Sequence, residues 1–408
     1  MIKRVVVTGV GLITPLGDTA HITFDRLLQG SVGITQIPTK EYPEINDLPV
    51  KLAGLLPPSF NLAGWTKKLT VVKNVYNATS LAVCSQALMD SGHEILTDEI
   101  SERTGLIFGC DRSSIMDIRR THEKVKEGGY AKLDRFIIPK VLASQSIGSI
   151  GIPLRIRGYA NSCSAGIPTG QVAIKDAFRI IQIGEADVMV AGAAEVEFDT
   201  ALLMSFYKSG FLSRGEDPML ACRPFETRRD GWVYSVGAGA VVLEELEHAK
   251  KRGARIYAEL AGGSSCADTE SAERDGNGQL RAMKIALKQA KVEGSEVDLV
   301  VADAPGWKHW DEAEALAISR LCPDCSVTSN KGNLGHMQAA SGAAQVVEGA
   351  LSIYHSKIPQ IPNLISPCTK AIELISTQPL EIPVTHAITN SFSYDSTCFT
   401  SLVFKKFG

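Results

Sequence analysis

Hydrophobic and polar positions along the chain form two kinds of segment. Short, mostly apolar runs at residues 3–10, 104–109, 187–192 and 297–302 predict buried strands. Longer segments, such as residues 172–181, repeat apolar side chains every three or four positions and predict amphipathic helices. Strands that alternate with helices indicate a layered α/β fold with mostly parallel, buried strands.

The pattern of elements occurs twice. A helix, a short polar stretch and a strand follow one another at residues 75–109 and again at residues 279–302. This repetition predicts two related halves, which we place at residues 1–250 and 251–408. Residues 111–150 interrupt the first half and predict a helical, partly basic insertion.

One cysteine lies in a turn of small residues just before the helix predicted at residues 172–181. The turn reads Asn161-Ser162-Cys163-Ser164-Ala165-Gly166. Unpaired backbone N–H groups and the helix dipole favour an anion at such a position, so we expect a lowered pKa for Cys163. The small neighbours leave room for a substrate carbonyl, as in a nucleophile elbow. The alternative is a buried, inert cysteine.

Composition excludes several classes of function. The 408 residues are 44% hydrophobic, enough for a large core, and the formal net charge of -3 gives no reason to expect nucleic acid binding. The sequence contains no run of 18 apolar residues, so it predicts no membrane span. Nine scattered cysteines predict reduced thiols in a cytoplasm. Cys322 and Cys325 have metal-ligand spacing, but no second pair accompanies them, so we expect a surface loop and no metal.

Several stretches, all in one order, resemble the β-ketoacyl synthases, the condensing enzymes of fatty acid and polyketide synthesis. They are the Cys163 turn, residues 185–192, residues 223–231, residues 329–336 and residues 389–392. The resemblance covers nearly the whole chain. It implies a thiolase-like, five-layered αβαβα fold made of two related halves, usually found as a dimer.

The resemblance also implies site residues. Active members use a cysteine, which accepts the acyl chain from the phosphopantetheine of an acyl carrier protein, and two histidines, which stabilise the enolate formed when malonyl is decarboxylated. Cys163 matches the cysteine and His336 the second histidine. Lys331 and Glu314 match the family's lysine and acid. No cofactor or metal of the chain's own is implied.

Two positions depart from the family pattern. Ala304 stands where the first histidine is expected, and His309, five residues on, reads as a surface residue. The glycine-rich turn after residue 392 is replaced by Ser393-Tyr394-Asp395-Ser396-Thr397-Cys398. Because glycine permits backbone angles that other residues resist, we expect an altered oxyanion turn.

The stretch from Ala302 to Gly306, together with residues 311–315, resembles the chain-length factors, the β subunits of type II polyketide synthases. These degenerate copies pair with an active ketosynthase and help to shape the cavity in which the chain grows. We therefore expect such a subunit, with an active ketosynthase and an acyl carrier protein as partners, although those subunits commonly carry another residue, often glutamine, in place of Cys163. The alternatives are a stand-alone acyltransferase that uses Cys163, or an atypical condensing synthase.

Overall fold

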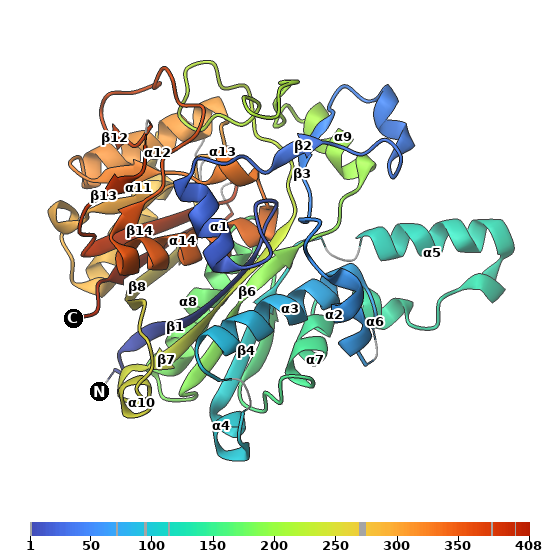
Figure 1. Cartoon of the computed structure of the whole chain (residues 1–408), viewed down its shortest axis with the longest axis horizontal. Coiled ribbons are helices and arrows are strands. Elements are labelled where there is room, and N and C mark those ends of the chain that lie inside the picture. The colour runs from blue at the N-terminus through green and yellow to red at the C-terminus, as the bar shows by residue number, and fades with distance from the viewer. Residues whose placement is uncertain are drawn as a thin grey trace.

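The strands of both halves join in one continuous sheet (Figure 1). The computed structural model describes residues 2–70, 72–93, 96–112, 115–268, 275–376, 378–395 and 397–408. Within these ranges the sheet has the order β12-β10-β9-β14-β15-β8-β1-β7-β6-β4-β5. The pairs β2–β3 and β11–β13 form two small separate sheets.

The strands come from the whole length of the chain. Those of the first half are β1 (Val5–Ile13), β2 (Ile34–Gln36), β3 (Leu52–Gly54), β4 (Thr104–Gly109), β5 (Ala160–Cys163), β6 (Val188–Glu195) and β7 (Gly237–Glu245). Those of the second half are β8 (Ala258–Cys266), β9 (Leu299–Val301), β10 (Ser326–Thr328), β11 (Lys357–Ile358), β12 (Glu373–Leu374), β13 (Leu380–Glu381), β14 (His386–Phe392) and β15 (Phe399–Lys405).

Helices separate these strands. In the first half they are α1 (Ala20–Leu28), α2 (Leu62–Lys68), α3 (Val75–Asp90), α4 (Asp98–Arg103), α5 (Ile115–Gly128), α6 (Ile137–Val141), α7 (Gln145–Gly151), α8 (Thr169–Gln182), α9 (Thr200–Lys208) and α10 (Leu246–Lys251). In the second half they are α11 (Asn277–Ala290), α12 (Lys308–Leu321), α13 (Lys331–Leu334) and α14 (Ser341–His355). Short 3₁₀ turns include η2 (Tyr130–Lys132) and η4 (Gln338–Ala340).

Helices α8 and α14 form the central layer of the molecule. They contact each other, and between them they pack on strands of both halves. Helix α3 covers the outer face of β1, β6 and β7, while α11 covers β8 and β15 and packs against α12. The two sheet halves and three helical layers give the predicted thiolase-like, five-layered αβαβα fold.

The direction of the strands differs from the prediction. The sheet is mixed, because β1 pairs antiparallel with both β7 and β8, and β14 pairs antiparallel with β15. The apolar runs predicted the strands correctly, since β1, β4 and β6 are buried along their whole length. Burial on both faces produces the same run in either direction, so hydropathy alone does not distinguish parallel from antiparallel pairs.

The hydropathy pattern also predicted the body of helix α8. Gly184 follows the helix with a φ of 80°, the left-handed conformation that commonly ends helices. Ala173, Ile174, Ala177, Phe178 and Ile181 are all buried on one face. The expected surface loop at Cys322 and Cys325 is wrong, because both thiols are buried in the core of the second half.

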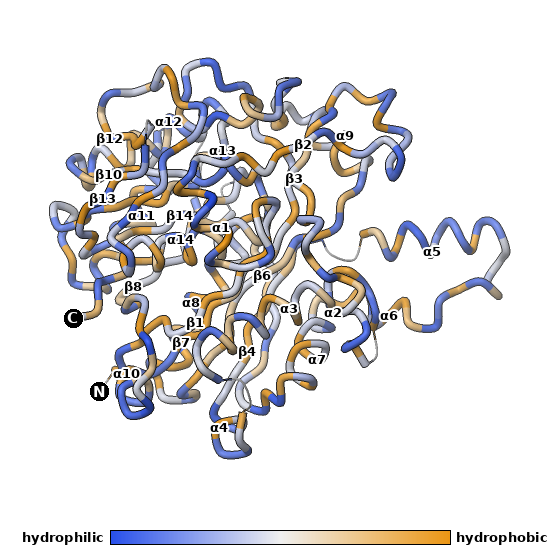
Figure 2. Tube along the Cα trace, viewed as in Figure 1, coloured by the Kyte–Doolittle hydropathy of each residue, from blue (hydrophilic) through white to orange (hydrophobic). Residues whose placement is uncertain are grey.

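The basic insertion forms a segment that projects from the body of the molecule (Figure 1). It contains α5, η2 and α6, and hydrophilic residues recur along α5 (Figure 2). Apolar side chains are nonetheless exposed between residues 118 and 152. They are Ile118, Tyr130, Leu133, Ile138, Leu142 and Ile152. Across the described part of the chain, no helix is long and apolar enough to cross a membrane.

Candidate active site

Cys163 is the last residue of β5, beside Gly109 of the parallel strand β4. Its Sγ lies 3.7 Å from the carbonyl oxygen of Thr169, the first residue of α8. A Cβ on Gly109 would lie 3.1 Å from this sulfur and 2.8 Å from the Cys163 carbonyl oxygen. Glycine is therefore needed at position 109 to leave room for the cysteine.

The expected lowering of the Cys163 pKa is wrong. Burial, and after it the charge of Asp176, raise the pKa of the thiol to about 12. The helix begins six residues after the cysteine rather than beside it, and the sulfur faces the carbonyl oxygen of Thr169 instead of free N–H groups. A thiol in these surroundings keeps its proton.

The second-half residues Lys331 and Glu314 hold the turn that contains Ala304. The Lys331 ammonium donates to the Asp303 carbonyl oxygen at 2.9 Å and pairs with the Asp303 carboxylate at 3.0 Å. The Glu314 carboxylate accepts the backbone N–H groups of Asp303 and Ala304 at 3.0 and 2.8 Å, and the Asn390 amide at 2.9 Å. Burial and the Asp303 charge raise the pKa of Glu314 to about 7. All these side chains are buried, so the turn is firmly fixed without a histidine.

His336 lies between α13 and η4, fully buried beside the Trp232 ring. Its Nδ1 accepts the backbone N–H of Gln338 at 3.0 Å, with the Gln338 amide nitrogen at 3.2 Å. Burial, with the charges of Lys331 and Arg112, lowers the pKa of His336 well below its usual value. With Nδ1 serving as an acceptor, the neutral ring carries its proton on Nε2 and offers that atom as a donor.

Arg112 completes this arrangement from the other half of the chain. Its guanidinium donates to the Gln338 Oε1 at 2.8 Å and pairs with Asp111 at 2.6 Å. Gln338 adopts a left-handed backbone with a φ of 49°, unusual for a non-glycine residue. Arg112 thus holds, through Gln338, the ring orientation of His336.

The final turn closes over the Cys163 turn. The Ser393 hydroxyl lies 2.9 Å from where a Cβ on Gly166 would stand, and Gly166 has a φ of 65°. The Ser393 backbone N–H donates to the Cys398 carbonyl at 2.8 Å, and Asp395 accepts the Thr397 hydroxyl at 2.6 Å. Ser396 lies outside the described residues.

Tyr394 brings a large ring into the site. It stacks on Phe211 with ring centroids 5.1 Å apart, and its centroid is 5.6 Å from that of Trp310 and 5.8 Å from that of His336. Tyr394 therefore lies in a cluster of aromatic rings that includes Phe211, Trp310 and His336. His309 lies in the first turn of α12 beside Trp307.

A cavity of about 430 Å³ lies where five segments of the chain meet. These segments are the residues after β4, the Cys163 turn, the His336 turn, α9 and the final turn. The residues that line the cavity include Arg112, Ile167, Phe206, Gln338, Tyr394 and Thr397. The sequence pointed to Cys163, His336, Lys331 and the altered final turn. It gave no signal for Arg112 or Gln338, because their roles depend on contacts between residues 226 positions apart.

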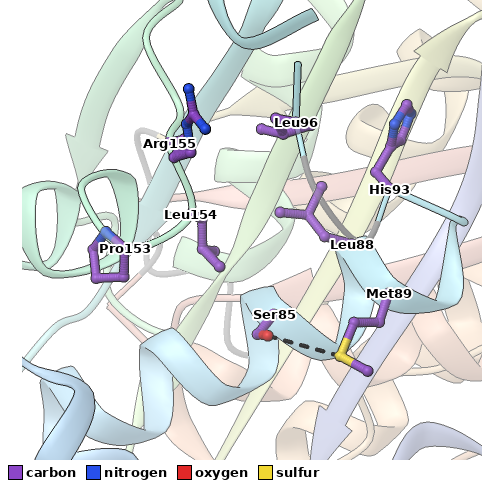
Figure 3. A pocket seen from close by; sticks show the side chains of 8 residues that line it. All are labelled: Ser85, Leu88, Met89, His93, Leu96, Pro153, Leu154 and Arg155. Atoms are coloured by element: carbon purple, nitrogen blue, oxygen red, sulfur yellow. Dashed lines mark hydrogen bonds between the residues drawn. The ribbon is translucent and has the colours of Figure 1, made fainter. Parts of the chain in front are cut away.

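Other cavities lie away from these residues. One, of about 170 Å³, lies between α3 and residues 153–155, where Ser85 approaches the Met89 sulfur at 4.0 Å (Figure 3). None of the expected site residues lines it. Within the described residues, no group of three histidine, cysteine or carboxylate side chains is placed to hold a metal ion.

Comparisons with known proteins decide the family. The profile of the β-ketoacyl synthase N-terminal domain matches residues 2–249, and that of the C-terminal domain matches residues 257–365. The chain belongs to the β-ketoacyl synthase family. This is a family of condensing acyltransferases, so the resemblance read from the Cys163 turn and residues 329–336 is confirmed.

Individual relatives agree with this assignment. The 3-oxoacyl-[acyl-carrier-protein] synthase 2 of Vibrio harveyi is 34% identical over 99% of both chains. The mitochondrial 3-oxoacyl-[acyl-carrier-protein] synthase of Arabidopsis thaliana is 34% identical over 97% of this chain and 92% of its own. A solved structure of the ishigamide ketosynthase/chain length factor superposes over both whole chains with a TM-score of 0.88 and 26% identity.

Proposed function

We propose that the chain is a chain-length-factor-like subunit of a type II polyketide synthase. It pairs with an active ketosynthase and helps to form the cavity for acyl chains, without decarboxylating malonyl by itself. The observation that carries this proposal is the buried turn at Ala304. A methyl group replaces the first histidine, and Lys331 is tied to Asp303.

The remaining groups suit binding better than decarboxylation. An enolate needs donors aimed at the oxygen on which charge develops. His336 keeps one such donor, whereas Ala304 contributes none. The high pKa of Cys163 leaves little thiolate at neutral pH. We therefore assign catalytic condensation to the partner.

Two surfaces support pairing with another ketosynthase copy. Strand β5 lies at the edge of the sheet, and its first residues, Ala160 and Asn161, are exposed. An open edge can extend a sheet across an interface. The projecting segment adds the exposed apolar side chains of Ile118, Tyr130, Leu133 and Ile138. Apolar side chains that stay exposed in one chain are typical of a surface that a partner covers.

We also propose an acyl carrier protein as a partner. The curated relatives are named as synthases of acyl-carrier-protein substrates, and the substrates of this chain would then arrive on phosphopantetheine, with no cofactor of its own. Residues 1–250 and 251–408 remain our proposed halves, and a cytoplasmic location remains a prediction.

The pairing is tested by co-expressing this chain with an active ketosynthase subunit of a type II polyketide synthase. Native mass measurement should find one copy of each chain in the purified particle. A chain that forms only a stable homodimer and ignores the co-expressed ketosynthase contradicts the proposal.

A second candidate is acyl transfer at Cys163 without decarboxylation. It is favoured by the retained cysteine, whose turn contributes Gly166 and Ile167 to the cavity wall. Cys163→Ala in the reconstituted complex separates the two functions. Near-complete loss of product, with the complex intact, would favour acyl transfer, whereas retained product favours the subunit role.

A further inference from the structure

Near the 430 Å³ cavity to which the Cys163 turn contributes Gly166 and Ile167, several hydrogen-bond donors have no acceptor. Among the residues that the structure describes, the Tyr394 hydroxyl, the His336 Nε2 and the Arg112 Nε are enclosed and have no hydrogen-bond partner. Buried polar groups are normally satisfied, so unpaired groups in one region call for an explanation such as a missing ligand. Arg112 and Tyr394 both line this cavity, and the His336 and Tyr394 rings lie 5.8 Å apart.

All three atoms act as donors. The His336 Nδ1 already accepts from Gln338, which leaves the proton on Nε2. Burial raises the pKa of the Tyr394 phenol well above its usual value, so the phenol keeps its proton. Arg112 uses its terminal nitrogens on Asp111 and Gln338, and its Nε–H remains. The ligand that satisfies them must therefore supply acceptor oxygens.

The charge around the cavity favours a neutral acceptor. Asp111 neutralises Arg112 at 2.6 Å, and Asp395 also lines the cavity. A carboxylate would have to compete with Asp111 for the same guanidinium. A carbonyl oxygen accepts hydrogen bonds without bringing a charge into the site.

We propose that Tyr394, together with His336, binds a keto oxygen of the acyl chain and makes this chain selective for β-ketoacyl over saturated acyl groups. The inference rests on the proposed function in one respect, namely that acyl chains enter this cavity. A saturated thioester offers one carbonyl oxygen, whereas a β-ketoacyl thioester offers a second oxygen two carbons away. A site built to hydrogen-bond an oxygen disfavours the analogue that lacks it.

The test compares acetoacetyl-pantetheine with butyryl-pantetheine, two four-carbon thioesters that differ in the keto oxygen. Dissociation constants are measured on the full-length chain carrying Cys163→Ala, which prevents acyl transfer. One hydrogen bond should make acetoacetyl-pantetheine bind about threefold to tenfold more tightly. Tyr394→Phe should remove most of this preference and leave butyryl-pantetheine binding unchanged. Tyr354→Phe, at an exposed position on α14, should keep the preference.

A second readout needs no change at Tyr394. Acetoacetyl-pantetheine labelled with ¹³C at the keto carbon should show a downfield shift of that carbon on binding. Equal affinities for the two thioesters, no binding of either, an unshifted keto carbon, or an unchanged preference in Tyr394→Phe would each overturn the inference. Pairing with the ketosynthase is measured separately by native mass, so the proposed function can stand when this inference fails.

Discussion

At the scale of single residues, the chemistry of a side chain depends more on its surroundings than on its position in a sequence motif. Cys163 lies in a turn that resembles a nucleophile elbow, yet its sulfur is partly buried and faces the Thr169 carbonyl oxygen. The sequence could indicate the cysteine and its small neighbours. It could not reveal which backbone groups face the sulfur, because that depends on how the turn packs against the start of α8 at Thr169.

Slow alkylation of Cys163 is the first prediction. With a pKa of about 12, the thiol should react with iodoacetamide at pH 7.5 about ten to a hundred times more slowly than a free peptide cysteine. The rate should keep rising with pH up to the onset of unfolding. Mass spectrometry of the modified peptide, at several pH values, gives the rate. A plateau near pH 7 would mean that the thiolate is stabilised after all.

A second prediction concerns Glu348, which is buried and accepts the Asn330 amide at 2.8 Å. Burial raises its pKa to about 7, above an ordinary value near 4.5. The folded chain therefore holds a proton between these pH values that the unfolded chain has lost, and this contribution to stability disappears as pH rises from about 4.5 to about 7.

Glu348→Gln keeps the shape and removes the titration. The unfolding free energy of the variant, relative to the parent, should therefore increase by about 3 kcal/mol between pH 4.5 and pH 8. Denaturant unfolding at several pH values measures it. Glu373→Gln, at an exposed position, serves as the control. If the difference in unfolding free energy between Glu348→Gln and the parent did not change with pH, it would contradict the raised pKa of Glu348.

At the scale of elements, the contact between α8 and α14 links the two halves behind the site. Gly170 lies in the first turn of α8, and a Cβ there would lie 2.8 Å from the Ala343 nitrogen and 2.9 Å from the Ala339 carbonyl oxygen. The hydropathy pattern predicted α8 and its buried face. It did not predict which helix packs there, since apolar faces indicate burial but do not name the partner.

Gly170→Ala should therefore destabilise the chain by about 1–3 kcal/mol, although alanine favours helices. Gly148→Ala is the matched control, because a Cβ at Gly148 in α7 meets nothing within 4 Å. That variant should be stabilised by up to about 1 kcal/mol. Thermal unfolding of both variants measures the effects. Equal effects at the two positions would mean that the close packing of α8 against α14 is not rigid.

At the scale of the whole molecule, the chain keeps the fold of its family, and we propose that part of the family's chemistry has changed. The layered fold and the two-half pattern were predictable, because strand and helix periodicities recur over hundreds of residues. The mixed direction of the sheet, and the joining of Arg112 to His336 through Gln338, were not, because both depend on contacts between distant segments. The sequence showed Ala304 where the family resemblance implies a histidine, and the structure adds the Lys331–Asp303 pair that fixes the turn at this position.

The most direct test of the account measures CO₂ released from malonyl-carrier protein by the purified chain alone. We predict no release above background, because Ala304 supplies no donor to the enolate and the turn around it is fixed. Ala304→His should not restore release, since Lys331 stays tied to Asp303 and the 393–398 turn stays altered. Turnover by the isolated parent chain, at rates like those of condensing relatives assayed beside it, would contradict the central claim.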